Sequence, residues 1–303
     1  MENEADLKEE LLKLSDKTKF SSRLLEKDYH LTRILHKIAE KQIKDLVFKG
    51  GTCLNKCYLG FYRLSEDLDF VYNKDVKNLT KVQIKKILDR IRRELFSVLN
   101  ELELKTNTEL GKGWKMLTSK EVPKIVGLEI TANYISMIDN SVQTIKLEVS
   151  FRNKLIKPTR MKIIEHEFVD ALGEPILRED AEIEAIDLTE NLAEKFRALV
   201  IRKNIAIRDI YDIYFILKNK IVKIDNELID LILIKINENR DKKFSKQDLL
   251  KFIESLNSKI SGLDDKEISS LLKSDEKVDI KEMVKVIYEE FQNSEKNRSN
   301  MAG

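Results

Sequence analysis

One stretch, residues 50–70, constrains this chain more than any other. It opens with Gly50-Gly51-Thr52, directly after the apolar run 46–48, and closes with Asp67-Leu68-Asp69-Phe70. The apolar run predicts a short buried strand, and the paired glycines let the backbone take a positive φ and approach a ligand closely. Residues 52–58 have a helical pattern, so the N–H groups at the start of that helix are expected to face an anion.

Asp67 and Asp69 are separated by one residue in a segment with the alternation of a strand. Their side chains are then expected on one face, roughly 7 Å apart, with Leu68 and Phe70 on the other. An isolated Asp-x-Asp is common on exposed strands, but two carboxylates beside a phosphate-binding turn favour a divalent metal site. The pattern predicts phosphoryl chemistry with two metals.

Composition sets broad limits. The chain has 303 residues, of which 36% are charged, and only 9 Gly and 3 Pro, which favours helices over an all-β fold. A net charge of +2 gives no overall basic signal for nucleic acid. Cys53 and Cys57 could form a redox pair or half a metal site, but we expect two buried thiols in a reducing compartment. The three histidines make no zinc pattern.

The N-terminal residues are acidic and lack the apolar segment of a signal peptide, and no run reaches the ~20 apolar residues of a membrane span. We therefore expect a soluble, cytoplasmic protein with no membrane partner. Apolar spacing predicts helices at 1–20, 24–42 and 80–99, a polar loop at 104–120, a hairpin of strands 124–134 and 141–151, a strand at 161–169, and helices after 180.

Glu148 lies in the second strand of that hairpin, where apolar residues alternate with polar ones, so its carboxylate is expected on the open face. It could be an ordinary exposed charge. It could also be the third carboxylate of a metal site, holding the metal and accepting the proton of an attacking hydroxyl.

Two later helices carry charges in unusual places. Asp187 and Glu190 resemble a capping box before a helix on which Lys195 and Arg202 share one edge of the apolar stripe. Lys195 could be a surface lysine or a cation that binds a triphosphate.

Asp209 and Asp212 are three apart on a segment that is apolar nearly all round. Buried carboxylates need partners, so they either form a structural ion pair with Arg208, Arg202 or Lys195, or orient Lys195 or a substrate. Both roles are compatible.

These motifs together resemble the AbiEii/AbiGii group of toxin nucleotidyltransferases (MenT-like), within the polymerase-β-like nucleotidyltransferase fold. The resemblance covers roughly residues 20–220. It rests on Gly50-Gly51-Thr52 with Arg63-x-Ser65-x-Asp67-x-Asp69, then Glu148, Lys195 with Arg202, and Arg208-Asp209-x-x-Asp212. The family more often has Asp where this chain has Glu148.

The resemblance implies a bilobal α/β (α+β) protein. Residues 1–175 would form a catalytic lobe with a small mixed sheet, 176–292 a helical lobe completing the cleft, and 293–303 a disordered tail. It implies two Mg²⁺ ions, or Mn²⁺, on Asp67, Asp69 and Glu148, with Lys195, Asp209 and Asp212 also catalytic. The NTP would contact Lys49, Gly50, Gly51, Thr52, Arg63, Ser65, Lys195 and Arg202.

The implied reaction transfers NMP from an NTP to an acceptor hydroxyl, in particular the 3′ end of tRNA. The implied role is the toxin of a bacterial toxin–antitoxin or phage-defence system, with a separately encoded antitoxin. A nucleotidyltransferase acting on a small molecule or a protein, or a non-catalytic NTP-binding module, remains the alternative.

Overall fold

The computed structural model describes residues 4–119, 124–151, 155–170, 172–238, 240–260, 263 and 265–301. The chain forms two compact units, one of Met1–Ile186 with Leu271–Ser274 and the other of Asp187–Ser270 with Asp275–Gly303. The mixed α/β class predicted from the sequence is confirmed. The division falls after Ile186, beyond the predicted residue 175.

The first unit is built on an eight-stranded mixed sheet in the order β3-β5-β6-β2-β1-β8-β7, with β4 also paired to β5. β2 is antiparallel to β1 and parallel to β6, and β5 and β6 form the expected antiparallel hairpin. The strands are β1 (Leu46–Lys49), β2 (Asp67–Tyr72), β3 (Lys105–Thr106), β4 (Trp114–Thr118), β5 (Ile125–Ile135), β6 (Val142–Ser150), β7 (Arg160–Ile163) and β8 (Glu182–Ala185).

The helices of this unit follow the expected periodicity. Thr80 caps α4 through a reciprocal capping box with Gln83, which fixes where that helix begins. A π-helical turn, η1, continues α3, a local widening that is common at functional sites. The helices are α1 (Glu4–Thr18), α2 (Ser22–Lys41), α3 (Gly50–Leu54), η1 (Asn55–Leu59) and α4 (Lys81–Glu101).

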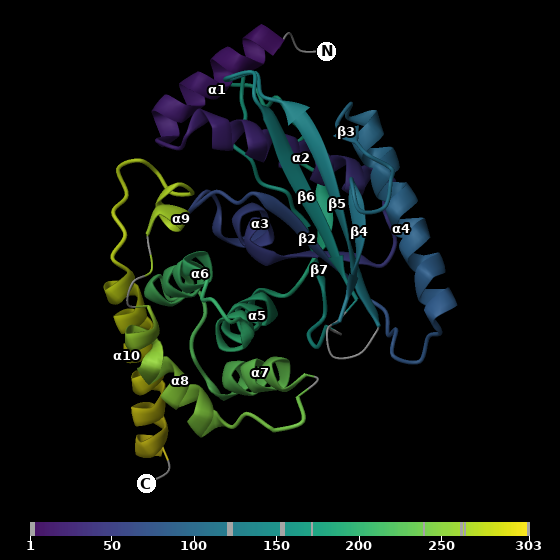
Figure 1. Ribbon diagram of the computed structural model, residues 1–303. Coiled ribbons are helices and arrows are strands. Elements are labelled where there is room, and N and C mark those ends of the chain that lie inside the picture. The colour runs from purple at the N-terminus through teal and green to yellow at the C-terminus, as the bar shows by residue number, and fades with distance from the viewer. Residues whose placement is uncertain are drawn as a thin grey trace. The chain divides into compact units, whose positions relative to one another are not determined.

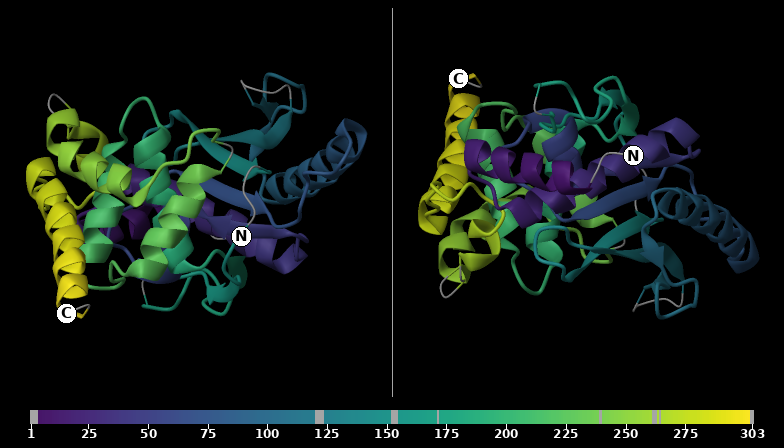
Figure 2. Two further views of the ribbon diagram at one scale, coloured as in Figure 1. Left: turned by 90° about the horizontal axis from the view of Figure 1, so that it is seen from below. Right: turned by 90° about the horizontal axis from the view of Figure 1, so that it is seen from above.

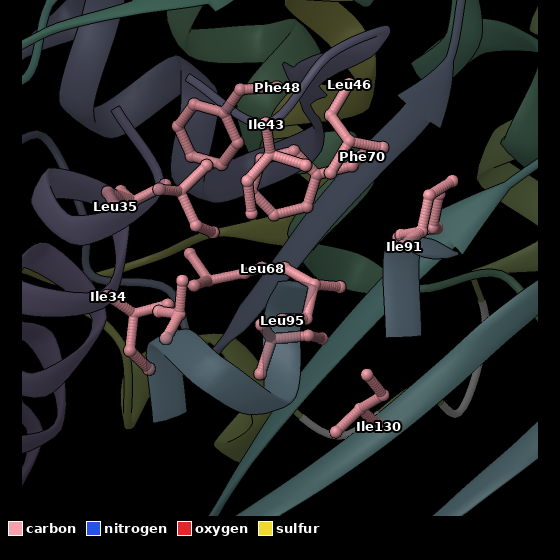
Figure 3. Close-up of a cluster of buried hydrophobic side chains, with 14 of the residues drawn as sticks. Ile34, Leu35, Ile43, Leu46, Phe48, Leu68, Phe70, Ile91, Leu95 and Ile130 are labelled. Carbon is pink, nitrogen blue, oxygen red and sulfur yellow. The ribbon is translucent and has the colours of Figure 1, made fainter. Parts of the chain in front are cut away.

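The apolar face of the central strands forms the core with α2 and α4 (Figure 1). Leu68 and Phe70 of β2 are fully buried there, beside Phe48 of β1, Ile34 of α2 and Leu95 of α4 (Figure 3). Because strand side chains alternate, burying this face leaves the polar residues of the same strands on the opposite face. The free thiols of two cysteines are buried in this unit, as expected: Cys53 and Cys57.

The described part of the second unit is helical. α10 contacts α6 and α8, and Figure 2 shows this yellow helix beside green helices of the same unit. Its backbone is helical through Met301, where a disordered tail was expected from residue 293. The helices are α5 (Leu188–Ile201), α6 (Ile207–Lys218), α7 (Asn226–Asn237), α8 (Lys246–Lys259), α9 (Lys266–Ser269) and α10 (Ile280–Met301).

Three strands depart from the sequence prediction. The predicted loop 104–120 contains β3 and β4, and β8 was not predicted. The strand expected at 161–169 is β7, which begins one residue earlier and ends at Ile163. β4 and β8 are short and mix apolar with charged residues, so their pairing with β5, β1 and β7 decides their conformation.

Candidate active site

The turn after β1 favours glycine at two positions, because side chains of other residues lie where a Cβ would be. Gly50 has a φ of +80°, and a Cβ there would lie 2.5 Å from Oδ2 of Asp69. A Cβ on Gly51 would lie 2.6 Å from Nη2 of Arg63 and 3.2 Å from Oγ of Ser65. The two motifs noted in the sequence therefore meet in space, with the Asp69 carboxylate packed on the glycine turn.

The loop that carries Arg63 and Ser65 is held from several sides. Arg63 is buried and its Nη1 donates to the Leu64 carbonyl at 2.8 Å. The Asn55 side chain donates to the Arg63 carbonyl at 2.6 Å, and the Leu64 N–H donates to the carbonyl of Leu271 at 2.9 Å. Sequence reasoning missed Asn55, since a lone amide on a helix carries no signal.

Thr52 ties α3 to β2. Its hydroxyl donates to the backbone carbonyl of Asp67 at 2.5 Å, and its side chain is buried. The threonine therefore fixes the strand end that bears Asp67.

Asp67, Asp69 and Glu148 lie on the polar face of the sheet. Asp69 of β2 is the Cα partner of both Lys49 of β1 and Glu148 of β6. The carboxylates of all three are half-buried, whereas their apolar neighbours in the same strands are buried. Among the residues that the structure describes, no group of three or more His, Cys, Asp or Glu side chains converges closely enough to hold a metal.

The donor set nevertheless fits a hard divalent cation, because carboxylate oxygens are the ligands that Mg²⁺ prefers. The bare Cα of Gly50 leaves the Asp69 carboxylate the room that any Cβ would take. Asp67 and Asp69, with Glu148 on the next strand, are therefore candidate ligands for such an ion.

Lys146 forms an ion pair with the Asp67 carboxylate. It is the Cα partner of Asp67, and its Nζ lies 3.4 Å from Asp67 Oδ2. Partial burial disfavours the charged amine, but attraction to Asp67, Asp69 and Glu129 outweighs that effect and raises the pKa of Lys146. Nothing in the sequence singled out Lys146.

A fourth carboxylate, Glu129 of β5, is the Cα partner of Glu148. Its own ion pair is with Lys115 of β4, at 2.8 Å. The face thus pairs two of its carboxylates with lysines from neighbouring strands.

A buried ion pair anchors the helix that follows the turn. Lys56 of η1 lies 2.6 Å from Oδ2 of Asp28 in α2, both side chains being almost fully buried, with the Phe61 ring 4.7 Å from the ammonium. Burial raises the pKa of Asp28, although Lys56 opposes that rise. The pair was not predicted, because the two residues are far apart in the sequence.

In the second unit, α6 presents its two buried carboxylates to α5. Lys195 Nζ lies 2.9 Å from an oxygen of Asp209 and 2.9 Å from one of Asp212, and Arg202 also pairs with Asp209. Lys195 is 11% exposed and Asp212 is fully buried. The expected ion pairing is present with Lys195 and Arg202, while Arg208 lies 3.8 Å from Glu267 instead.

The opposite side of α5 holds a second buried cation. Lys235 of α7 lies 2.5 Å from Glu190 and 3.4 Å from Glu194. Asp187 caps α5 through the Thr189 N–H, as expected of a cap. The carboxylate of Glu190, the other residue of the predicted capping box, pairs with the buried Lys235 ammonium.

The comparisons with known proteins agree with a nucleotidyltransferase. Residues 33–289 match the sequence profile of the family described as the nucleotidyl transferase AbiEii toxin of type IV toxin–antitoxin systems, and the chain belongs to this family. It is therefore a nucleotidyltransferase toxin, an activity that implies an NTP substrate. None of the curated proteins matches the chain.

Solved structures share the fold. MenT4, a nucleotidyltransferase toxin of Mycobacterium tuberculosis, is 18% identical with a TM-score of 0.59, over 95% of this chain and 88% of that one. JHP933 of Helicobacter pylori is 18% identical with a TM-score of 0.53, over 93% of this chain and 98% of that one. Within the described ranges, no helix is both long and apolar enough to cross a membrane.

Proposed function

We propose that the chain transfers NMP from an NTP to the 3′-terminal hydroxyl of tRNA, with two Mg²⁺ ions, or Mn²⁺, held by Asp67, Asp69 and Glu148. The observation that carries the proposal is the packing of the Asp69 carboxylate on Gly50, which joins a metal ligand to a phosphate-binding turn. The acceptor oxygen forms a bond to the α-phosphorus, the bond to the bridging oxygen breaks, and pyrophosphate leaves.

The residues of the first unit divide the work. The backbone of Gly50, Gly51 and Thr52 binds the β- and γ-phosphates, with Lys49 beside it, while Arg63 and Ser65 keep the turn in shape. Glu148 would accept the proton of the acceptor hydroxyl. When bound, the divalent ions supply the positive charge that offsets the charge of the triphosphate in the transition state.

Lys195 and Arg202 are proposed cations for the triphosphate. The paired contacts of Lys195 with Asp209 and Asp212 would hold its ammonium in one orientation, which lowers the entropic cost of binding. The two aspartates would then act through Lys195.

The proposed setting is the bacterial cytoplasm, where the toxin blocks translation until a separately encoded antitoxin counteracts it, as part of a phage-defence response. Type IV membership supports an antitoxin gene.

The test incubates the protein with each NTP labelled at the α-phosphate, Mg²⁺ and total tRNA. We expect label in tRNA with one or more NTPs, and none with Asp69→Ala. Glu167→Ala, an exposed carboxylate of the same unit outside the site, is the matched control and should label like the wild type. Transfer by Asp69→Ala at the wild-type rate would contradict the assignment.

The same assay separates the alternatives. Label in a small molecule or in polypeptide, with none in tRNA, would identify a different acceptor. Saturable NTP binding with no label in any acceptor would indicate a non-catalytic module, although three carboxylates on one face have no evident use there.

A further inference from the structure

The polar face of the sheet contains a cation that the proposed reaction does not use. Lys146 projects from β6 beside the proposed metal ligands, two residues before Glu148 and level with Asp67. Its Nζ lies 3.4 Å from Asp67 Oδ2, and the lysine is 37% exposed. The ammonium therefore occupies space beside the carboxylate that would bind a metal.

Because Lys146 already pairs with Asp67, binding of a metal ion without a nucleotide is unfavourable at this face. An ion that binds Asp67 must break the ion pair and then remain a few ångströms from a displaced positive charge. A metal that arrives with a nucleotide does not meet this penalty to the same extent, because the triphosphate brings negative charge of its own.

We propose that Lys146 is the counter-ion of the nucleotide-free site and makes metal binding depend on the nucleotide. The inference rests on the proposed function, because it takes Asp67 as a metal ligand. Lys146 is a positioning residue in this role: it holds the Asp67 carboxylate until a metal–nucleotide complex displaces it.

The experiment titrates Mn²⁺ into nucleotide-free protein and follows the free ion by electron paramagnetic resonance. Lys146→Met is expected to bind Mn²⁺ about tenfold more tightly than the wild type, the effect expected of removing one charge at this range. Lys146→Arg keeps the charge and should bind close to the wild-type value.

Lys115→Met is the matched control. Lys115 lies on the same sheet and pairs with Glu129 at 2.8 Å, so its loss removes the same charge without freeing Asp67. We expect a smaller gain than in Lys146→Met. Equal gains in Mn²⁺ affinity in both variants would show that the effect comes from net charge alone and would overturn the proposal.

A second titration contains a non-hydrolysable NTP analogue. The wild type should gain far more Mn²⁺ affinity from the analogue than Lys146→Met does; an equal gain would overturn the inference. Circular dichroism melts verify folding, and Lys146→Gln serves if the Met variant is unstable.

Failure of this inference differs from failure of the proposed function. If Asp67→Asn weakens Mn²⁺ binding but Lys146→Met matches the wild type, only the role of Lys146 falls. If neither the wild type nor any variant binds Mn²⁺ in either titration, both the proposed metal site and the counter-ion role of Lys146 are wrong.

Discussion

At the scale of single residues, Gly50 is the most restricted position of the site. Its φ of +80° disfavours any side chain, and a Cβ would lie 2.5 Å from Asp69 Oδ2. We expect Gly50→Ala to displace the Asp69 carboxylate and to reduce nucleotide transfer by about a hundredfold. Its unfolding free energy should fall by ~1–3 kcal/mol in urea.

Gly111→Ala is the control for backbone strain alone. Gly111 has a φ of +85°, and a Cβ there would meet nothing within 4 Å. We expect a stability cost of ~1 kcal/mol with transfer activity retained. Full activity of Gly50→Ala would contradict the close approach of Asp69.

Thr52 offers a test of the contact between α3 and β2. Thr52→Val keeps the shape but leaves the Asp67 carbonyl without this donor, which we expect to cost ~1–3 kcal/mol in urea unfolding. Thr52→Ser retains the hydroxyl and should recover most of the stability and of the transfer rate. Equal stabilities of the Val and Ser variants would show that the hydrogen bond contributes little.

The sequence identifies those residues whose types are unusual in their pattern. Paired glycines before a helix and paired aspartates on a strand are such cases, and the approach of Asp69 to Gly50 joins them in the structure. Lys146 and Asn55 are ordinary residues in their own segments. Only strand register and the loop path bring them to the site, and one sequence does not contain that information.

At the scale of elements, α5 lies between two charged partners. Its Lys195 side meets the aspartates of α6, and its Glu190 side meets Lys235 of α7. Buried pairs such as these contribute little net stability when intact, but loss of one partner leaves an uncompensated charge.

Asp212→Ala tests this reasoning. The substitution leaves Lys195 with Asp209, which it must share with Arg202, so we expect a loss of ~3 kcal/mol in urea unfolding together with reduced nucleotide transfer. Glu267→Ala, which removes the exposed partner of Arg208, should change stability by under ~1 kcal/mol. An Asp212→Ala protein with wild-type stability but no activity would exclude a structural role.

Element prediction succeeds where periodicity is long and fails where it is short. α2, α4 and the β5–β6 hairpin have many apolar residues at regular spacing, and the structure confirms them. β8 has only Ile183 and Ala185 as buried residues, and they alternate with Glu182 and Glu184. Its conformation depends on β1 and β7, which the local sequence cannot specify.

At the scale of the whole molecule, we expect buried histidines of the first unit to lower the free energy of unfolding at acid pH. Both ring nitrogens of His30 are buried with no hydrogen-bond partner among the described residues, and its ring lies 4.1 Å from that of Tyr134. Burial, with a smaller effect of Arg33, lowers the pKa of His30 to about 3. The unfolded chain therefore binds a proton below pH 6.5 that the folded chain binds only near pH 3.

Folding stability should accordingly be complete above pH 6.5 and decline as the pH falls toward 3. His30→Phe removes this contribution and fits among aromatic neighbours. Between pH 7 and pH 5 we expect the wild type to lose about 2 kcal/mol more unfolding free energy than His30→Phe, measured by urea titration at each pH. His36→Phe, at a site where burial lowers the pKa to about 4, should show nearly the same difference over this range and a smaller one only below about pH 4. Parallel pH profiles for wild type and His30→Phe would contradict the buried neutral imidazole.

Chain organisation was predicted in outline. A mixed first part and a helical second part follow from the change in apolar spacing near residue 180, and both are present. The boundary after Ile186 and the return of Leu271–Ser274 to the first unit were not predicted. The local sequence of those four residues does not predict their return, because hydrogen bonds to distant backbone groups fix their position.

That return has a consequence for synthesis of the toxin. The Leu64 N–H, between Arg63 and Ser65, donates to the carbonyl of Leu271, and the Ser274 N–H donates to that of Lys19. The ribosome makes residue 64 long before residue 271, so the loop against the glycine turn lacks this support in the nascent chain. A product that ends before residue 271 lacks the acceptor of the Leu64 N–H, so we expect its glycine turn to be less firmly held than in the longer chain.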